Sequence, residues 1–170
     1  MTVVSAERAT NGYLLGKGDG EAHWLLGMLE IIKVSGQDTN GEYGLLEVTA
    51  RPGDGSPWHV HPDEDEWFYV LDGEFTVYVG DRRLSLPTGS FAFGPRGVPH
   101  TFIGETDGAK ALVGFQPFQF EGFLHEVGEP AIERVLPPPL SAPPDMERLL
   151  PIAERNGMVI LGPPGPPPRR

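Results

Sequence analysis

The chain has 170 residues and a formal net charge of -11, and this length predicts one domain over residues 1–170. A chain this acidic repels phosphate backbones, so nucleic acid is not an expected partner. Because the sequence contains no cysteine, disulfides, thiolate metal sites and cysteine nucleophiles are excluded.

Glycine and proline are frequent, with 23 and 19 copies spaced along the chain. So many breakers between short apolar segments favour an all-β protein of short strands. No segment is long and apolar enough to span a bilayer, so a membrane is not an expected partner. Residues 1–20 lack the basic and apolar regions of a signal peptide, which predicts a cytoplasmic location.

The first part of the chain predicts three strands. A short edge strand is expected around residues 13–15, and the apolar run 24–34 predicts one long strand with Gly27 as a bulge. Residues 35–41 are polar and predict a loop, after which residues 43–50 predict the third strand.

The next two predicted strands, residues 58–61 and 66–71, are expected to pair around a short acidic connection. Asp72-Gly73 then predicts a hairpin turn into a strand over residues 75–79. The register of this part of the sheet would follow from that turn.

A second tight turn is predicted at Gly80-Asp81, before a strand over residues 83–86. Further strands are expected at residues 90–93, 100–103 and 111–115. Strands this short and evenly spaced indicate a β-barrel or sandwich whose core spans about residues 22–117.

Residues 118–170 predict a helical segment and a proline-rich tail. A short helix is expected over residues 120–127, as a candidate lid on the barrel. Asp145 predicts the N-cap of a second helix that ends before Gly157, and Pro151 predicts a kink or two short helices. Residues 158–161 predict a last strand.

Four residues carry most of the functional information: His59, His61, Glu66 and His100. Side chains alternate along a strand, so His59 and His61 are expected to point to the same side. Imidazoles and a carboxylate with open coordination positions suit a divalent transition metal. The sequence therefore predicts a metal centre built from these residues.

Two motifs surround these residues. The first, G-(x)5-H-x-H-(x)4-E-(x)6-G, contains Gly53, His59, His61, Glu66 and Gly73; the second, G-(x)5-P-x-G-(x)2-H, contains Gly89, Pro95, Gly97 and His100. In this order and spacing they resemble the two motifs of the cupin superfamily. The second family motif often ends in asparagine, where this chain has Gly104.

The resemblance implies an all-β fold, an antiparallel jelly-roll β-barrel followed here by short C-terminal helices. It implies one divalent transition metal (iron, manganese, nickel, cobalt, zinc or copper) held by His59, His61, Glu66 and His100. It also implies a homodimer paired through strand edges, a role that the apolar run 24–34 would suit.

The complete ligand set makes the chain similar to single-barrel relatives of quercetin 2,3-dioxygenase. The resemblance implies a dioxygenase acting on a small aromatic or enolic substrate, with Glu66 also taking a substrate proton. An aromatic substrate pocket is predicted from Phe68, Phe91, Phe93, Phe102 and Phe115. Two alternatives remain: a metal-assisted isomerase or lyase of a small metabolite, and a non-catalytic barrel that binds a small molecule.

The other polar and aromatic residues near the motifs are predicted to have structural roles. Asp63-Glu64-Asp65 is interpreted as a solvated acidic loop. His23 and His125 lie outside both motifs and are expected to be surface or structural residues. Trp58, Trp67 and Tyr69 are expected to face away from the ligands.

Overall fold

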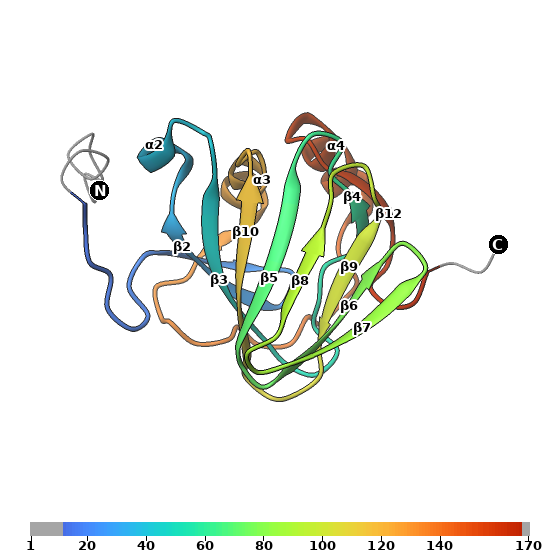
Figure 1. The fold of residues 1–170 in the computed structure, drawn as a ribbon, viewed down its shortest axis with the longest axis horizontal. Helices are drawn as coiled ribbons and strands as arrows, with labels where there is room; N and C mark the ends of the chain where they lie inside the picture. The colour runs from blue at the N-terminus through green and yellow to red at the C-terminus, as the bar shows by residue number, and fades with distance from the viewer. Residues whose placement is uncertain (1–11, 168–170) are drawn as a thin grey trace.

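The computed structural model describes residues 12–167, which form two antiparallel β-sheets (Figure 1). The seven-stranded sheet has the order β11-β1-β2-β3-β10-β5-β8, and the five-stranded sheet has the order β12-β4-β9-β6-β7. The predicted all-β jelly-roll fold with short C-terminal helices is confirmed. None of the helices within residues 12–167 is long and apolar enough to cross a membrane.

The strands of the first sheet are β1 (Glu21–Leu25), β2 (Met28–Val34), β3 (Gly44–Ala50), β5 (Asp65–Asp72), β8 (Phe91–Gly94), β10 (Ala109–Gln116) and β11 (Glu129–Pro130). Those of the second are β4 (Trp58–Val60), β6 (Glu74–Val79), β7 (Arg82–Pro87), β9 (His100–Gly104) and β12 (Val159–Gly162). The helices are α2 (Gly36–Thr39), α3 (Phe120–Val127) and α4 (Met146–Arg155). Both α3 and α4 lie at the same end of the sheets, at the top of Figure 1.

The main core lies between the two sheets, because each strand turns every second side chain inward. Phe68 of β5 packs against Phe102 of β9 with ring centroids 5.6 Å apart, and Phe102 also contacts Phe75 of β6. All three rings are at least 95% buried, and each contributes roughly 1.5–3 kcal/mol of hydrophobic stabilisation. These contacts join the sheets and fix the distance between residues that face each other across the core.

The apolar run 24–34 forms a hairpin instead of the one strand predicted. Leu26 and Gly27 make a two-residue turn in which both have positive φ, 50° and 90°. Two positive φ values match the turn type that joins twisted antiparallel strands, and glycine adopts them without strain. β2 therefore pairs with β1 and β3 on its two edges, and neither edge is free for strand exchange.

Two predicted pairings in the motif region are also wrong. β4 and β5 belong to different sheets, so residues 58–61 and 66–71 do not pair. Asp72-Gly73 is not a hairpin turn, because the chain crosses there from one sheet to the other. Gly73 has a φ of 72°, and a side chain there would meet Thr106 Oγ1 at 2.2 Å. The sequence correctly indicated that Gly73 lies where the chain changes direction, but the change of direction is a corner of the jelly roll and not a hairpin.

The remaining local predictions divide clearly. The turn at Gly80-Asp81 and the helix over residues 120–127 are confirmed. Asp145 caps α4, which continues through Pro151 as one helix and not as two. No strand forms at residues 13–15, because β11 takes the place beside β1. The predicted loop over residues 35–41 contains α2, started by a capping box.

Candidate metal centre

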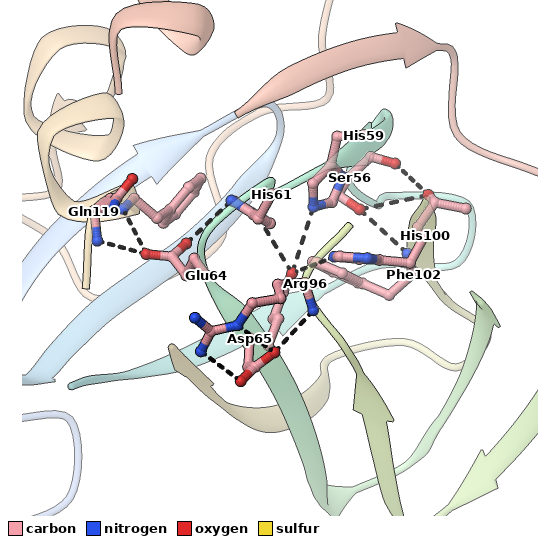
Figure 2. Close-up of polar contacts among 12 residues, drawn as sticks. Ser56, His59, His61, Glu64, Asp65, Arg96, His100, Phe102 and Gln119 are labelled. Atoms are coloured by element: carbon pink, nitrogen blue, oxygen red, sulfur yellow. Dashed lines mark hydrogen bonds and ion pairs between the residues drawn. The ribbon is translucent and has the colours of Figure 1, made fainter. Parts of the chain in front are cut away.

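Four buried side chains from both sheets meet between them. His59 of β4 lies directly opposite His100 of β9, while Glu66 comes from β5 of the other sheet. His61 follows β4, and Figure 2 shows its ring turned toward the same point as the other two imidazoles. The Nε2 atoms of His100, His59 and His61 lie 2.7, 3.4 and 3.6 Å from Oε2 of Glu66. The four residues singled out by the motifs are thus brought together, each no more than 3% exposed.

The second nitrogen of each imidazole lies near an oxygen atom. Nδ1 of His59 lies 2.7 Å from the Pro57 carbonyl oxygen, and Nδ1 of His100 lies 2.8 Å from that of Val98. Nδ1 of His61 lies 3.1 Å from Oε1 of Glu64, but without the geometry of a hydrogen bond. For His59 and His100 the acceptors place the proton at Nδ1 and leave the Nε2 lone pairs free to coordinate a metal.

The charges of the cluster are strongly coupled. Burial raises the pKa of Glu66, but its contacts with His100, His59 and His61 outweigh burial and hold the pKa well below its ordinary value. Burial, helped by the charge of His100, lowers the pKa of His59 to about 4. For His100 the hydrogen bond with Glu66 outweighs burial and raises the pKa. A metal that replaces the proton between His100 and Glu66 would release it, so binding should strengthen as pH rises.

The donor set fits a divalent transition metal. Its ligand atoms, three imidazole nitrogens and one carboxylate oxygen, all lie within 4.8 Å of one another. Three neutral imidazoles and one carboxylate are ligands that iron, nickel, copper and zinc accept, with positions left for water or substrate. Core packing alone gives no reason to bury four such groups with their polar atoms facing inward.

Glu64 is a functional residue that the sequence analysis missed, and its assignment to a solvated loop is wrong. Its side chain is fully buried, and Oε1 contacts His61 as described above. The other oxygen, Oε2, accepts hydrogen bonds from the backbone N–H groups of Gln119 and Phe120, at the start of α3 (Figure 2). Burial raises the pKa of Glu64 to about 7. One carboxyl group thus connects a metal ligand to the helix beside the site. The sequence does not show this role, because it does not reveal in which direction a loop side chain points.

Asp65 has a similar anchoring role at the edge of the site. Its carboxylate accepts hydrogen bonds from the backbone N–H, Nε and Nη2 of Arg96, at 2.8, 3.1 and 2.7 Å. Gly97, the next residue, donates its N–H to the His61 carbonyl oxygen at 2.8 Å. The loop that leads into His100 is thereby tied to the segment that carries His61 and Glu66.

Gly104, where the family motif often has asparagine, is required by a close backbone approach. A side chain at this position would meet the Arg51 carbonyl oxygen at 2.7 Å. The backbone of Gly104 instead exchanges hydrogen bonds with Gly53 and Asp54. The departure from the motif therefore belongs to the packing of this turn and leaves the ligands unchanged.

An apolar cavity of about 30 Å³ adjoins the four ligand residues, which is room for about two water molecules. Phe102 and Phe115 line it, as predicted, together with Phe120 and Phe123 of α3. An aromatic ring needs far more space, on the order of the 150 Å³ cavity that binds benzene in an engineered protein.

Phe91 and Phe93 do not line this cavity and are 61% and 48% exposed on the outer face of β8. They lie across from Tyr69 and Trp67 of β5 and share their outward face. A shift of one residue changes the face of every side chain in a strand, and the aromatic composition could not reveal it. Phe68 is buried in the core against Phe102 and is not among the cavity-lining residues.

Trp58, Trp67 and Tyr69 face away from the ligands, as expected. Trp58 is buried on the other side of β4, where its Nε1 donates a hydrogen bond to the Gly165 carbonyl oxygen. The Trp67 ring lies over Gly114 and contacts Phe91, outside the core. None of the three is among the residues that line the cavity.

A second missed residue, Glu30, lines the same cavity from β2, in the same sheet as Glu66. It lies on β2 between Met28 and Ile32, whose side chains belong to the main core, and it is only 3% exposed. Its Oε2 is buried with no hydrogen-bond partner among the described residues. Burial, with a smaller effect of the charge on Glu66, raises the pKa of Glu30 to about 8. The sequence did carry a signal here, a lone carboxyl in an otherwise apolar run.

A two-sheet jelly roll with three histidines and one glutamate buried between its sheets defines the class of metal-binding cupin-type proteins. A family model described as "Cupin domain" matches residues 46–114. Among curated proteins, the chain is similar to quercetin 2,3-dioxygenase of Bacillus subtilis (strain 168), with 31% identity over 90 residues. This match covers 53% of the chain but only 27% of that relative, so the chain spans about a quarter of its length.

Solved structures show the same fold. KdgF from Halomonas sp. has 17% identity and a TM-score of 0.56, with coverage of 64% of this chain and 94% of that one. A predicted oxalate decarboxylase from Thermotoga maritima has 14% identity and a TM-score of 0.58, with coverage of 62% and 100%. The polyketide cyclase RemF from Streptomyces resistomycificus has 20% identity and a TM-score of 0.53, with coverage of 62% and 78%. Residues 46–114 thus match a cupin domain, and the fold is the one seen in these structures.

Proposed function

We propose that the protein is a metal-dependent dioxygenase that acts on a small aromatic or enolic substrate. The observation that carries the proposal is the complete set of three imidazoles and one carboxylate, buried beside an apolar cavity. The similarity to quercetin 2,3-dioxygenase over 90 residues supports the same class. When bound, a redox-active metal would supply Lewis-acid activation of substrate oxygen and a position for dioxygen.

In this proposal His59, His61, Glu66 and His100 hold the metal, and the residues around them prepare the site. Glu64 and the carbonyl groups of Pro57 and Val98 orient the imidazoles. Glu66 has a second oxygen that could accept a substrate proton, as a general base must. Phe102, Phe115 and Phe120 keep water away from the reacting atoms.

The first test combines metal analysis with oxygen uptake. The buried centre of the wild-type protein should hold about one redox-capable metal, and His59→Ala/His61→Ala should lose that ion. The loaded wild type should consume oxygen with a flavonol or with a smaller enolic diketone. Loaded protein that consumes no oxygen with either class of compound would contradict the proposal.

A metal-assisted isomerase or lyase is the second candidate, and the small cavity favours it. About 30 Å³ beside the ligands suits a compact oxygenated metabolite better than an aromatic ring. Such an enzyme would turn over its substrate without oxygen, so activity under anaerobic conditions separates it from the dioxygenase. A binding protein without turnover would return its ligand unchanged.

We also propose a homodimer, a small molecule as the functional partner, and a cytoplasmic location. The exposed aromatic surface of Trp67, Tyr69, Phe91 and Phe93 offers a candidate contact between two copies. Light scattering that gives the mass of one chain would contradict the dimer.

A further inference from the structure

The cavity beside the ligands is also lined by a carboxyl group on β2, that of Glu30. Glu30 is held on the inner face of β2, and its Oε2 has no partner among the described residues. In an apolar surrounding an unpartnered carboxyl group costs several kcal/mol less as the neutral acid than as the carboxylate. A neutral carboxyl group is both a hydrogen-bond donor and an acceptor.

The surroundings of Glu30 explain why it is not a simple core residue. Its cross-strand neighbours on the same face are Val48 of β3 and His23 of β1. Val48 and Met28 line the cavity together with Glu30, and the other polar lining residues are Ser56 and the ligands His59, His61 and Glu66. The Ser56 hydroxyl is already hydrogen-bonded to Thr101 and Phe102. Apart from the ligands, Glu30 is therefore the one described side chain of the cavity lining that has a polar atom left to offer a proton or a hydrogen bond.

We propose that Glu30 is a substrate-contacting residue, whose neutral carboxyl group donates a hydrogen bond to an oxygen atom of the substrate at the end away from the metal. This inference rests on the proposed function, since it assumes that a small molecule occupies the cavity. It narrows the substrate class to compact molecules with two oxygen functions, one for the metal and one for Glu30. A hydrogen bond made only when the ligand is bound explains why the protein retains a buried polar group without a partner.

The test uses Glu30→Gln, which keeps a hydrogen-bond donor, and Glu30→Leu, which does not. Glu47→Leu is the matched control, because Glu47 lies on the outer face of β3 beside Lys33. Protein loaded with cobalt(II) is titrated with 3-hydroxypropionate, whose carboxylate can bind the metal and whose hydroxyl group can reach Glu30, and binding is followed by the visible spectrum of the metal. Glu30→Leu should bind the probe about tenfold more weakly, a change of about 1.4 kcal/mol, with Glu30→Gln in between and the control unchanged.

A second readout needs no ligand. Metal-free Glu30→Leu should melt about 4 °C or more above the wild type, because it removes an unsatisfied buried group. Equal probe binding by Glu30→Leu and the wild type, no probe binding by loaded wild type, or a lower melting temperature for Glu30→Leu would overturn the inference. A different result would contradict the proposed dioxygenase function and leave the role of Glu30 standing: loaded wild type binds the probe through Glu30 but consumes no oxygen with any enolic compound.

A different observation supports an independent second inference, at the junction of β1 and α3. Nε2 of His23 on β1 and Nε2 of His125 on α3 both lie 2.9 Å from Oε1 of Glu21. His23 is 6% exposed, whereas the side chains of Glu21 and His125 are 55% and 43% exposed. Here two imidazoles converge on one carboxylate. This arrangement is like that of the buried centre, but with one histidine fewer.

We infer that Glu21, His23 and His125 form a second site for a divalent transition metal, with water completing the coordination. Two imidazoles and a carboxylate on one side of an ion form a known ligand set for such metals. Glu21 and His23 share the inner face of β1 because they are two residues apart. An ion here would join β1 to α3, the helix that carries Phe120 and Phe123 to the cavity. The expectation that both histidines are only surface or structural residues would then need correction.

Nickel(II) is the probe for this site, measured as metal per chain after desalting. Wild type should retain two ions, and both His125→Ala and His59→Ala/His61→Ala should retain one. Glu126→Ala is the matched control, because Glu126 lies on the same helix but pairs with Arg155; it should retain two. One ion per chain in the wild type, with none in His59→Ala/His61→Ala, would overturn the inference.

Discussion

The two walls of the buried cavity, one with the four ligand residues and one with Glu30, are built in different ways. On the ligand wall His59 and His100 each have a hydrogen-bond acceptor at Nδ1 and bind Glu66 through Nε2, while His61 contacts Glu64 and Glu66 at 3.1 and 3.6 Å without hydrogen-bond geometry. On β2, which β3 and β10 separate from the strand of Glu66, Glu30 has a buried oxygen with no partner among the described residues. The difference indicates that the ligand wall is organised in advance to hold a metal, while the Glu30 wall keeps a polar group free for a ligand.

The largest effect is expected from removing an anchor of the ligand wall. Glu64→Ala leaves His61 without its carboxylate contact at Nδ1 and the first N–H groups of α3 without a partner. Metal affinity should fall by about 10- to 100-fold, as it does when outer partners of metal ligands are lost. Competition with a chelator of known affinity measures the loss.

The control for this experiment is Asp63→Ala, in the same acidic run but exposed. It should leave the metal affinity within a factor of about two, because exposed charges contribute little. If Glu64→Ala bound metal as tightly as the wild type, the anchoring role of Glu64 would be refuted, and His61 would be oriented by packing alone.

The unpartnered carboxyl group of Glu30 should make the stability of the protein depend on pH. Glu30 has a folded-state pKa of about 8, raised from 4.5 mainly by burial, so the folded protein holds this proton more tightly than the unfolded chain. Its contribution to stability is therefore complete below about pH 4.5 and is lost as the pH rises toward about 8. Relative to Glu30→Gln, the unfolding free energy of the metal-free wild type should therefore fall by up to about 1.4 kcal/mol per pH unit in this range.

Urea unfolding of both proteins at pH 5, 6, 7 and 8 tests this dependence, because other titrating groups cancel in the difference. Glu47→Gln, on the outer face, should run parallel to the wild type over the same range. A constant difference between wild type and Glu30→Gln would mean that Glu30 finds a partner or water in solution.

The contrast between the walls also explains what the sequence could and could not reveal. The ligands were predictable because His59 and His61 alternate on one strand and because two spaced motifs include Glu66 and His100. The direction of Glu64 was not, since a loop residue between two charged neighbours has no periodicity to orient it. Glu30 was recognisable only as an anomaly, and its position in the cavity lining depends on the hairpin at Leu26-Gly27, which pattern alone did not predict.

Pairing between strands was the least predictable feature. The segments before and after the acidic run have ideal strand patterns, yet β4 and β5 lie in different sheets. A turn sequence such as Asp72-Gly73 specifies a local reversal of the chain and not the sheet to which the next strand belongs. That choice depends on the packing of Phe68 and Phe75 against Phe102, residues far apart in the chain.

The smallest effect on stability and metal affinity is expected from the anchoring contact at the surface, between Arg96 and Asp65. Arg96→Ala removes the two side-chain hydrogen bonds to Asp65 but keeps the one from the backbone N–H, and half of the Arg96 side chain is exposed. Exposed ion pairs of this kind typically contribute less than about 1 kcal/mol, and the bond between Gly97 and His61 remains. Unfolding free energy should therefore fall by less than about 1 kcal/mol, and metal affinity by less than about fivefold. A loss of metal affinity as large as that of Glu64→Ala would show that the surface contact between Arg96 and Asp65 is needed to position the ligands, and that the buried acceptors alone do not fix their geometry.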